Sequence, residues 1–184
     1  IGILPIVAST YNIEISVAGL LVSLFALAVA VSGPILPLLL SKYNRKTIMI
    51  ISLGTFFICN VISAFAGSFW LVLVARVVPA FLHPVYVSLS FAIASSSVSE
   101  KEAPKAVAKV MVGVSAGMVL GVPVMSYIAN LFSLEIPMLA FALVNLIALA
   151  LTIIYVPSMP VKEKMSYGSQ LKILKDINLW WVLI

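Results

Sequence analysis

Residues 70–94 read WLVLVARVVPAFLHPVYVSLSFAIA. This apolar run is long enough to cross a lipid bilayer as one α-helix, which takes about 20 residues. It also contains a charged residue, Arg76, and the one histidine of the chain, His83. Because a charge inside hydrocarbon costs about 3 kcal/mol or more, we expect Arg76 to face a protein interior or a water-filled cavity.

Arg76 and His83 are seven positions apart, and seven steps of about 100° return nearly to the starting direction. The two side chains are therefore predicted to share one helix face, with Pro79 and Pro84 loosening the backbone beside them. Simpler interpretations remain open for both residues. In the simpler interpretation of Arg76, the residue lies near the membrane surface and extends its guanidinium to the headgroups. His83 would be a packed, neutral, hydrogen-bonded side chain and not a titrating one.

The composition is that of an integral membrane protein. Hydrophobic residues make up 63% of the chain and charged residues 9%, and the mean hydropathy is +1.22. A soluble domain is about half apolar and a quarter charged. The net charge of +5 does not indicate nucleic-acid binding, because the basic residues lie in short loops. Cys59 is the one cysteine, so we expect neither a disulfide framework nor a metal cluster, and we expect no cofactor.

Five apolar stretches are predicted to span the bilayer completely: residues 15–40, 48–66, 70–94, 105–129 and 137–156. Residues 1–8 are interpreted as the end of an earlier span and residues 178–184 as the start of a later one, so we expect both ends to be truncated. Residues 157–177 form a basic connector, which lies on the membrane surface or is a solvated linker. Ser99 and Glu102 fit a capping box and predict a helix that starts near Glu100.

The basic residues predict the orientation in the membrane. They gather in the loop at residues 41–47, in the segment 101–109 and in the connector, which all lie on one side of the predicted spans. The opposite loops carry only Glu14 and Glu135 as charges. By the positive-inside rule, we expect a multi-pass protein of the cell (inner) membrane with the basic loops in the cytoplasm.

Residues 111–126 read MVGVSAGMVLGVPVMS. Gly113, Gly117 and Gly121 are spaced by four, so one helix face carries almost no side chains and a second helix can approach it closely. Pro123 removes an amide hydrogen and favours a bend. The seam is either static or slides during a conformational cycle.

Three motifs give the chain its resemblance to the N-terminal half of the major facilitator superfamily. Residues 37–49, PLLLSKYNRKTIM, resemble the family's loop motif G-x-L-x-D-R-x-G-R-K, although Pro37, Ser41 and Asn44 stand where glycine, aspartate and glycine are expected. Arg76 matches the arginine of the R-x-x-Q-G motif, with Pro79 and Ala80 replacing its glutamine and glycine. Residues 117–123, GMVLGVP, resemble the antiporter motif. The matching loop positions are Leu39, Lys42, Arg45 and Lys46.

The opening residues 3–27, ILPIVASTYNIEISVAGLLVSLFAL, are similar to the drug and sugar efflux branch, which includes arabinose-efflux-type permeases. The resemblance implies an all-α exporter of twelve spans. Residues 1–156 would be its N-terminal six-helix bundle, built from inverted three-helix repeats. The substrate, a drug, sugar or metabolite, would bind between this bundle and a missing C-terminal half. Alternating access would couple its export to proton influx.

For this transport cycle, Arg76 and His83 are the proton-coupling candidates. Arg76 would lower the pKa of a neighbouring carboxylate or bind an anionic group, and His83 would carry a proton or hydrogen-bond substrate. No complete predicted span contains Asp or Glu, so a coupling carboxylate would lie elsewhere. Polar residues inside the spans are weaker cavity candidates and are equally explained as helix-packing hydrogen bonds. They are Ser23, Asn60, Tyr86 and Ser126.

Other functions remain alternatives. A facilitator or importer on the same fold is one, and a scaffold or non-functional truncated product is another. A membrane enzyme is disfavoured, because one histidine without an intramembrane carboxylate does not supply convergent catalytic groups.

Overall fold

The computed structural model describes residues 3–159 of the chain. The connector beyond Met159 and the predicted seventh span at residues 178–184 therefore lie outside the described residues. Within the described range the chain is helical and contains no strand. The elements are α1 (Leu4–Thr10), α2 (Ile15–Ala18), α3 (Leu20–Leu40), α4 (Arg45–Ala64), α5 (Phe69–Ser96), α6 (Ala103–Ala116), the π-turn η1 (Gly117–Gly121), α7 (Val122–Leu131) and α8 (Glu135–Tyr155).

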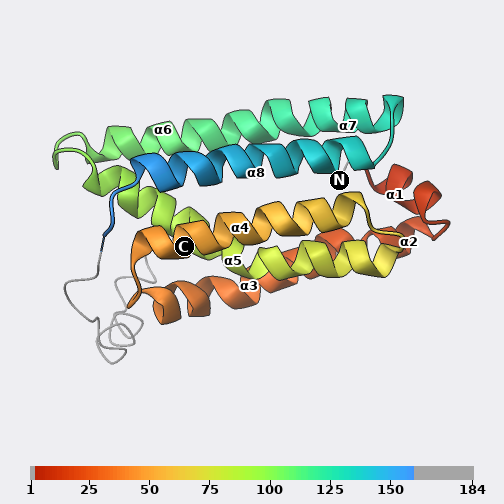
Figure 1. The fold of residues 1–184 in the computed structure, drawn as a ribbon, viewed down its shortest axis with the longest axis horizontal. Helices are drawn as coiled ribbons and strands as arrows, with labels where there is room; N and C mark the ends of the chain where they lie inside the picture. The colour runs from red at the N-terminus through yellow and green to blue at the C-terminus, as the bar shows by residue number, and fades with distance from the viewer. Residues whose placement is uncertain (1–2, 160–184) are drawn as a thin grey trace, which may run out of the picture.

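Five helical rods are long and apolar enough to cross a membrane: Ile15–Leu40, Arg45–Ala64, Phe69–Ser96, Ala103–Leu131 and Glu135–Tyr155. They lie side by side along one axis and are joined by short turns (Figure 1). The prediction of an all-α membrane fold is confirmed.

Helix α4 occupies the centre of the bundle. It packs against α8 on one side and against α5 on the other, and α5 in turn packs against α3. The rod formed by α6, η1 and α7 lies at the edge, with α5 and α8 as its neighbours. This arrangement places α5, which carries Arg76, between α3 and α4.

The hydrophobic core is densest at the end of the bundle where α1 lies. Val7 of α1 and Val72 of α5 are fully buried there, and Met138 of α8 is nearly so. The chain reverses after α1 through Asn12, whose φ of 50° is a left-handed conformation that asparagine tolerates. The same core cluster includes residues from four of the five long rods, so burial of these apolar side chains holds α1 against the bundle.

Side chains and backbone chemistry set several helix boundaries. The Asn44 side chain accepts a hydrogen bond from the Lys46 amide at the start of α4, and Ser68 accepts one from Leu71 at the start of α5. Both use the N-cap arrangement that satisfies otherwise unpaired amides.

The start of α6 corrects one prediction. The helix begins at Ala103 and not near Glu100. The Ser99 hydroxyl donates to the Glu102 carboxylate at 3.3 Å, and the Ser99 carbonyl accepts from the amides of Glu102 and Ala103. A separate turn therefore precedes the helix, and Glu102 does not complete a capping box.

The glycine-rich rod contains a π-turn that the sequence analysis did not predict. Pro123 lacks the amide that would bond the Val119 carbonyl in an α-helix. A π-turn shifts the bonding pattern by one residue, which relieves this mismatch. Residues 111–120 are all exposed, and a Cβ added at Gly113, Gly117 or Gly121 would meet no atom within 4 Å. The glycine face thus has no neighbour among the described residues.

Candidate functional site

A cavity of about 150 Å³ lies between four of the long helices. Helix α5 supplies Arg76, Pro79 and His83, and α4 supplies Asn60. The structure therefore brings Arg76 and His83 to one cavity, as their seven-residue spacing predicts. We name this space the Arg76 cavity. Its lining is Phe25, Phe56, Asn60, Ala75, Arg76, Pro79, His83 and Asn145.

Arg76 gives the cavity its charge. It lies seven residues after Phe69, the first residue of α5, which is roughly 10 Å into the helix. The residue is half-buried, and no acidic residue lines the cavity. A guanidinium presents five donors in a planar fork that suits a carboxylate or phosphate. The site can therefore attract an anionic group or favour the ionised form of a carboxylic acid that approaches it.

His83 lies two helical turns beyond Arg76, roughly 10 Å further along α5. Its ring packs against Phe25 with centroids 5.9 Å apart and an interplanar angle of 68°. The residue is exposed. This geometry leaves the imidazole accessible from the cavity for hydrogen bonding or proton transfer.

Two asparagines add neutral polar groups to the cavity. Asn60 donates its Nδ2 to the Phe56 carbonyl oxygen at 2.8 Å, and Asn145 donates to the Phe141 carbonyl oxygen at 2.9 Å. These bonds hold each amide against its own helix and leave its Oδ1 as an acceptor. Sequence reasoning named Asn60 and missed Asn145, although both carry the same signal of an amide inside an apolar span.

The other three polar candidates do not line the cavity. Tyr86 packs on Phe56, which lines the cavity, with ring centroids 5.8 Å apart. Ser23 is exposed and donates to the Gly19 carbonyl oxygen at 3.2 Å. Ser126 lies on α7, where its backbone carbonyl accepts from Asn130 Nδ2 at 2.8 Å. The arrangement thus groups Asn60 and, indirectly, Tyr86 with Arg76 and His83.

The basic loop motif lies at one end of the bundle, away from the cavity. Lys46 donates its Nζ to the Ile153 carbonyl oxygen at 2.7 Å, and Asn44 donates its Nδ2 to Ser158 Oγ at 2.7 Å. The Arg45 amide also donates to the Met159 carbonyl oxygen at 3.4 Å. These three bonds fasten the start of α4 to the end of α8.

The other two matching positions of the motif are placed differently. Lys42 lies over the neighbouring Tyr43 ring, 5.3 Å from its centroid, and Leu39 is exposed on α3.

Known proteins match this chain along most of its length. The model of the Major Facilitator Superfamily matches residues 1–184. The uncharacterized MFS-type transporter YtbD of Bacillus subtilis (strain 168) is 34% identical over 180 residues, 97% of this chain and 46% of that protein. AraJ of Escherichia coli (strain K12), named as a transporter, is 26% identical over 181 residues, 98% of this chain and 46% of that protein.

A probable sugar efflux transporter of Helicobacter pylori (strain P12) is 26% identical over 123 residues, 67% of this chain and 32% of that protein. The chain spans about half the length of the first two relatives and less of the third.

Proposed function

Because this chain belongs to the Major Facilitator Superfamily, we propose that residues 1–156 form the N-terminal six-helix half of a twelve-helix secondary transporter. In this proposal α1 is the end of the first span, and the five long rods are the second to sixth spans. Residues 157–177 connect to the second half, whose first span starts at residue 178. The lengths of the relatives support this, since the matched part is 46% of YtbD and of AraJ.

The protein exports a small molecule, a drug, sugar or metabolite, and proton influx drives the export by alternating access. One observation carries the proposal: Arg76 and His83, a fixed cation and a titratable group, line the same cavity between membrane helices. Ionisable groups at this depth mark substrate or proton pathways. The name of the Helicobacter pylori relative supports export of a sugar.

Each cavity residue has a distinct task in this cycle. Arg76 stabilises a carboxylate in its ionised form, or holds an anionic part of the substrate. His83 accepts and releases a proton. Since no acidic residue lines this cavity, a coupling carboxylate comes from elsewhere in the protein. Gly113, Gly117, Gly121 and Pro123 form a seam that receives a helix of the second half.

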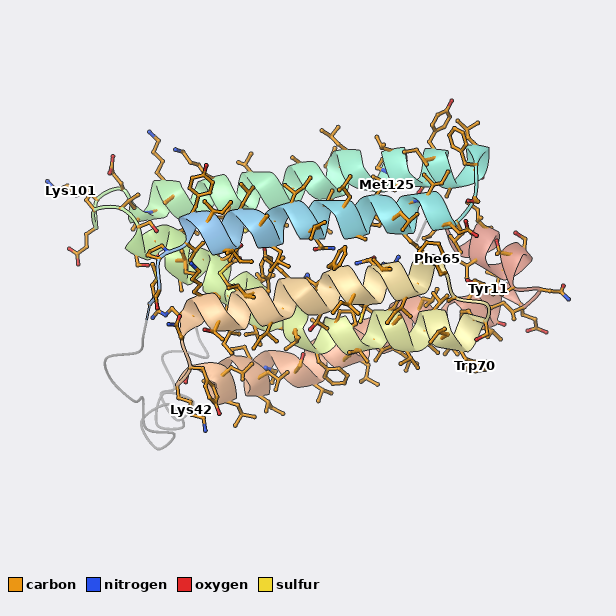
Figure 2. All side chains as sticks on the ribbon, viewed as in Figure 1. Tyr11, Lys42, Phe65, Trp70, Lys101 and Met125 are labelled. Atoms are coloured by element: carbon orange, nitrogen blue, oxygen red, sulfur yellow. The ribbon has the colours of Figure 1, made fainter. Side chains whose placement is uncertain are left out.

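The charges of the loops support an orientation in the cell (inner) membrane. Lys42 and Lys101 lie at one end of the bundle, and Tyr11, Phe65 and Trp70 lie at the other (Figure 2). In the described turns at the second end, no lysine or arginine is present. We place the basic end in the cytoplasm.

Transport by the full-length protein in proteoliposomes tests this function. An imposed proton gradient should drive accumulation of candidate sugars and drugs in wild-type vesicles. Arg76→Ala and His83→Ala should uncouple transport from the gradient, whereas Ser23→Ala, on α3 outside the cavity, should not. Unchanged coupling in both cavity variants would remove these residues from the mechanism. A facilitator would instead show substrate counterflow with no proton flux and no accumulation in response to the gradient.

The intact mass of the protein in its native membrane tests the twelve-helix architecture. The 184-residue chain has a mass of 19.7 kDa, and we expect a product of about twice that mass. A product near 20 kDa would contradict the proposal and favour the alternative of a scaffold or a non-functional fragment.

A further inference from the structure

A second and larger cavity, of about 540 Å³, lies at the end of the bundle opposite the basic loops. It is lined by the end of α1, the turn between α4 and α5, and the turn before α8. We name it the end cavity. Tyr11 and Phe65 lie there, at the same end as Trp70 (Figure 2). Its volume falls within the range of about 300–1,000 Å³ that small-molecule sites occupy.

Glu135 is the one charged residue in the lining of the end cavity. It is exposed to solvent. Neither the residues that line the cavity nor the described turns at this end of the bundle include a lysine or arginine. Arg76 lines the other cavity and not this one. The cavity therefore has an uncompensated negative charge at its wall.

Three aromatic rings share the cavity with this carboxylate: Tyr11, Phe65 and Phe132. Tyr11 donates its hydroxyl to the Ala66 carbonyl oxygen at 3.0 Å, and its ring packs edge-on against Phe69 at 6.4 Å. These contacts fix the ring in place. Burial, and to a smaller extent the negative charge of Glu135, raise the pKa of Tyr11 above its ordinary value of 10.0.

A carboxylate among aromatic rings is the chemistry that recognises an organic ammonium ion. The carboxylate attracts the charge, and the negative faces of the rings attract a cation that is only weakly hydrated. We propose that the end cavity binds a small organic cation between Glu135 and the rings of Tyr11, Phe65 and Phe132. This site is separate from the transport cavity and goes beyond the proposed transport function.

Each lining residue also has an ordinary structural role. Glu135 lies in the first turn of α8, where a negative charge favours the helix. Exposed rings such as Phe65 and Phe132 are common at a membrane surface. Neither role requires the carboxylate and the three rings to line the same cavity. Only the proposed site predicts saturable binding of an organic cation that depends on Glu135.

Equilibrium dialysis of radiolabelled tetraethylammonium against the purified full-length protein in a neutral detergent tests the site. The wild type should bind one tetraethylammonium per chain saturably. Glu135→Gln should weaken binding by about tenfold and Phe132→Leu by about threefold. The matched control is Glu14→Gln, because Glu14 is an acid at the same end of the bundle that instead accepts a hydrogen bond from Ser16 at 2.9 Å. The affinity of the Glu14→Gln variant for tetraethylammonium should stay within about twofold of that of the wild type.

Three results would overturn the proposal: no saturable binding to the wild type, unchanged binding to Glu135→Gln, or an equal loss with Glu14→Gln, which would indicate only general surface charge. Size-exclusion profiles check that each variant is folded, and Phe132→Leu still tests the site if Glu135→Gln misfolds. Because dialysis involves no gradient and no transport, failure of this site is distinguishable from failure of the proposed export.

Discussion

Lys46 Nζ lies 2.7 Å from the Ile153 carbonyl oxygen, and this hydrogen bond joins residues 107 positions apart. Ile153 lies in the last turn of α8, where backbone carbonyls have no partner within the helix. The ammonium group therefore satisfies a free carbonyl and places a positive charge at the negative end of the helix. The bond fixes the two ends of the α4–α8 pair at the basic face of the bundle.

Lys46→Met should lower the free energy of unfolding by about 1 kcal/mol, because it removes this hydrogen bond and leaves a helix end unpaired. Thermal unfolding in detergent measures the change, followed by a thiol-reactive dye that reaches the buried Cys59 as the protein opens. Lys42→Met is the matched control, since Lys42 lies over Tyr43 in the same loop. Equal effects of the two variants would contradict a specific role for Lys46.

Tyr11→Phe should destabilise the protein by about 1 kcal/mol, because the Ala66 carbonyl loses its donor while the ring keeps its packing. The pKa of Tyr11 is raised in the fold, so the neutral hydroxyl is the favoured form. Its contribution is fully present below the ordinary value of 10.0 and is lost as the pH rises through the folded pKa.

Thermal unfolding of wild type and Tyr11→Phe between pH 6 and pH 9 checks this expectation. The difference between the two proteins should be constant across that range, which lies below 10.0. A difference that disappears within the range would show that the hydroxyl ionises there, contrary to the raised pKa.

Arg76→Leu should abolish coupled transport and raise the free energy of unfolding by about 1–3 kcal/mol, because it removes a charge from the membrane interior that no lining carboxylate compensates. Thermal unfolding and proteoliposome transport measure the two effects. Lys109→Leu on α6 is the control, because Lys109 is an exposed cation and its removal should give no such gain. A lower unfolding temperature for Arg76→Leu would contradict the interpretation of an uncompensated charge.

Gly117→Leu should leave thermal stability unchanged or slightly raised, by up to about 1 kcal/mol, since leucine favours a helix more than glycine does and a Cβ at this position meets no atom within 4 Å. Transport should fall about tenfold or more if a second helix packs on the glycine face. Ser115→Leu, on another face of α6, should transport normally. Normal transport by Gly117→Leu would refute the seam.

The sequence predicted those features that depend on one helix at a time. Apolar length located the five rods, and the seven-residue spacing brought Arg76 and His83 to one cavity. Asn145 escaped prediction because its place opposite Arg76 depends on α8 packing beside α4, and periodicity alone does not reveal which helices pair. The Lys46–Ile153 bond and the end cavity depend on the same pairing.

Other misses arose from backbone chemistry. A capping box requires Glu102 to reach the Ser99 amide, but its carboxylate accepts from the Ser99 hydroxyl instead. The sequence analysis also missed the π-turn before Pro123, where the chain accommodates the missing amide by widening one turn. At both places the residue types allow more than one backbone conformation. The conformation that forms depends on the geometry of the neighbouring turns, which the sequence pattern does not show.

The widened turn at Gly117–Gly121 also determines where the three glycines point. In an α-helix, a step of four residues overshoots one full turn by about 40°, so residues spaced by four wind gradually around the helix. A π-turn is wound less tightly, and its step of four falls short of a full turn. The overshoot from Gly113 to Gly117 and the shortfall from Gly117 to Gly121 offset each other. Ideal helix geometry therefore predicts that the glycines form a strip of bare backbone nearly parallel to the axis, which a straight neighbouring helix can follow without coiling.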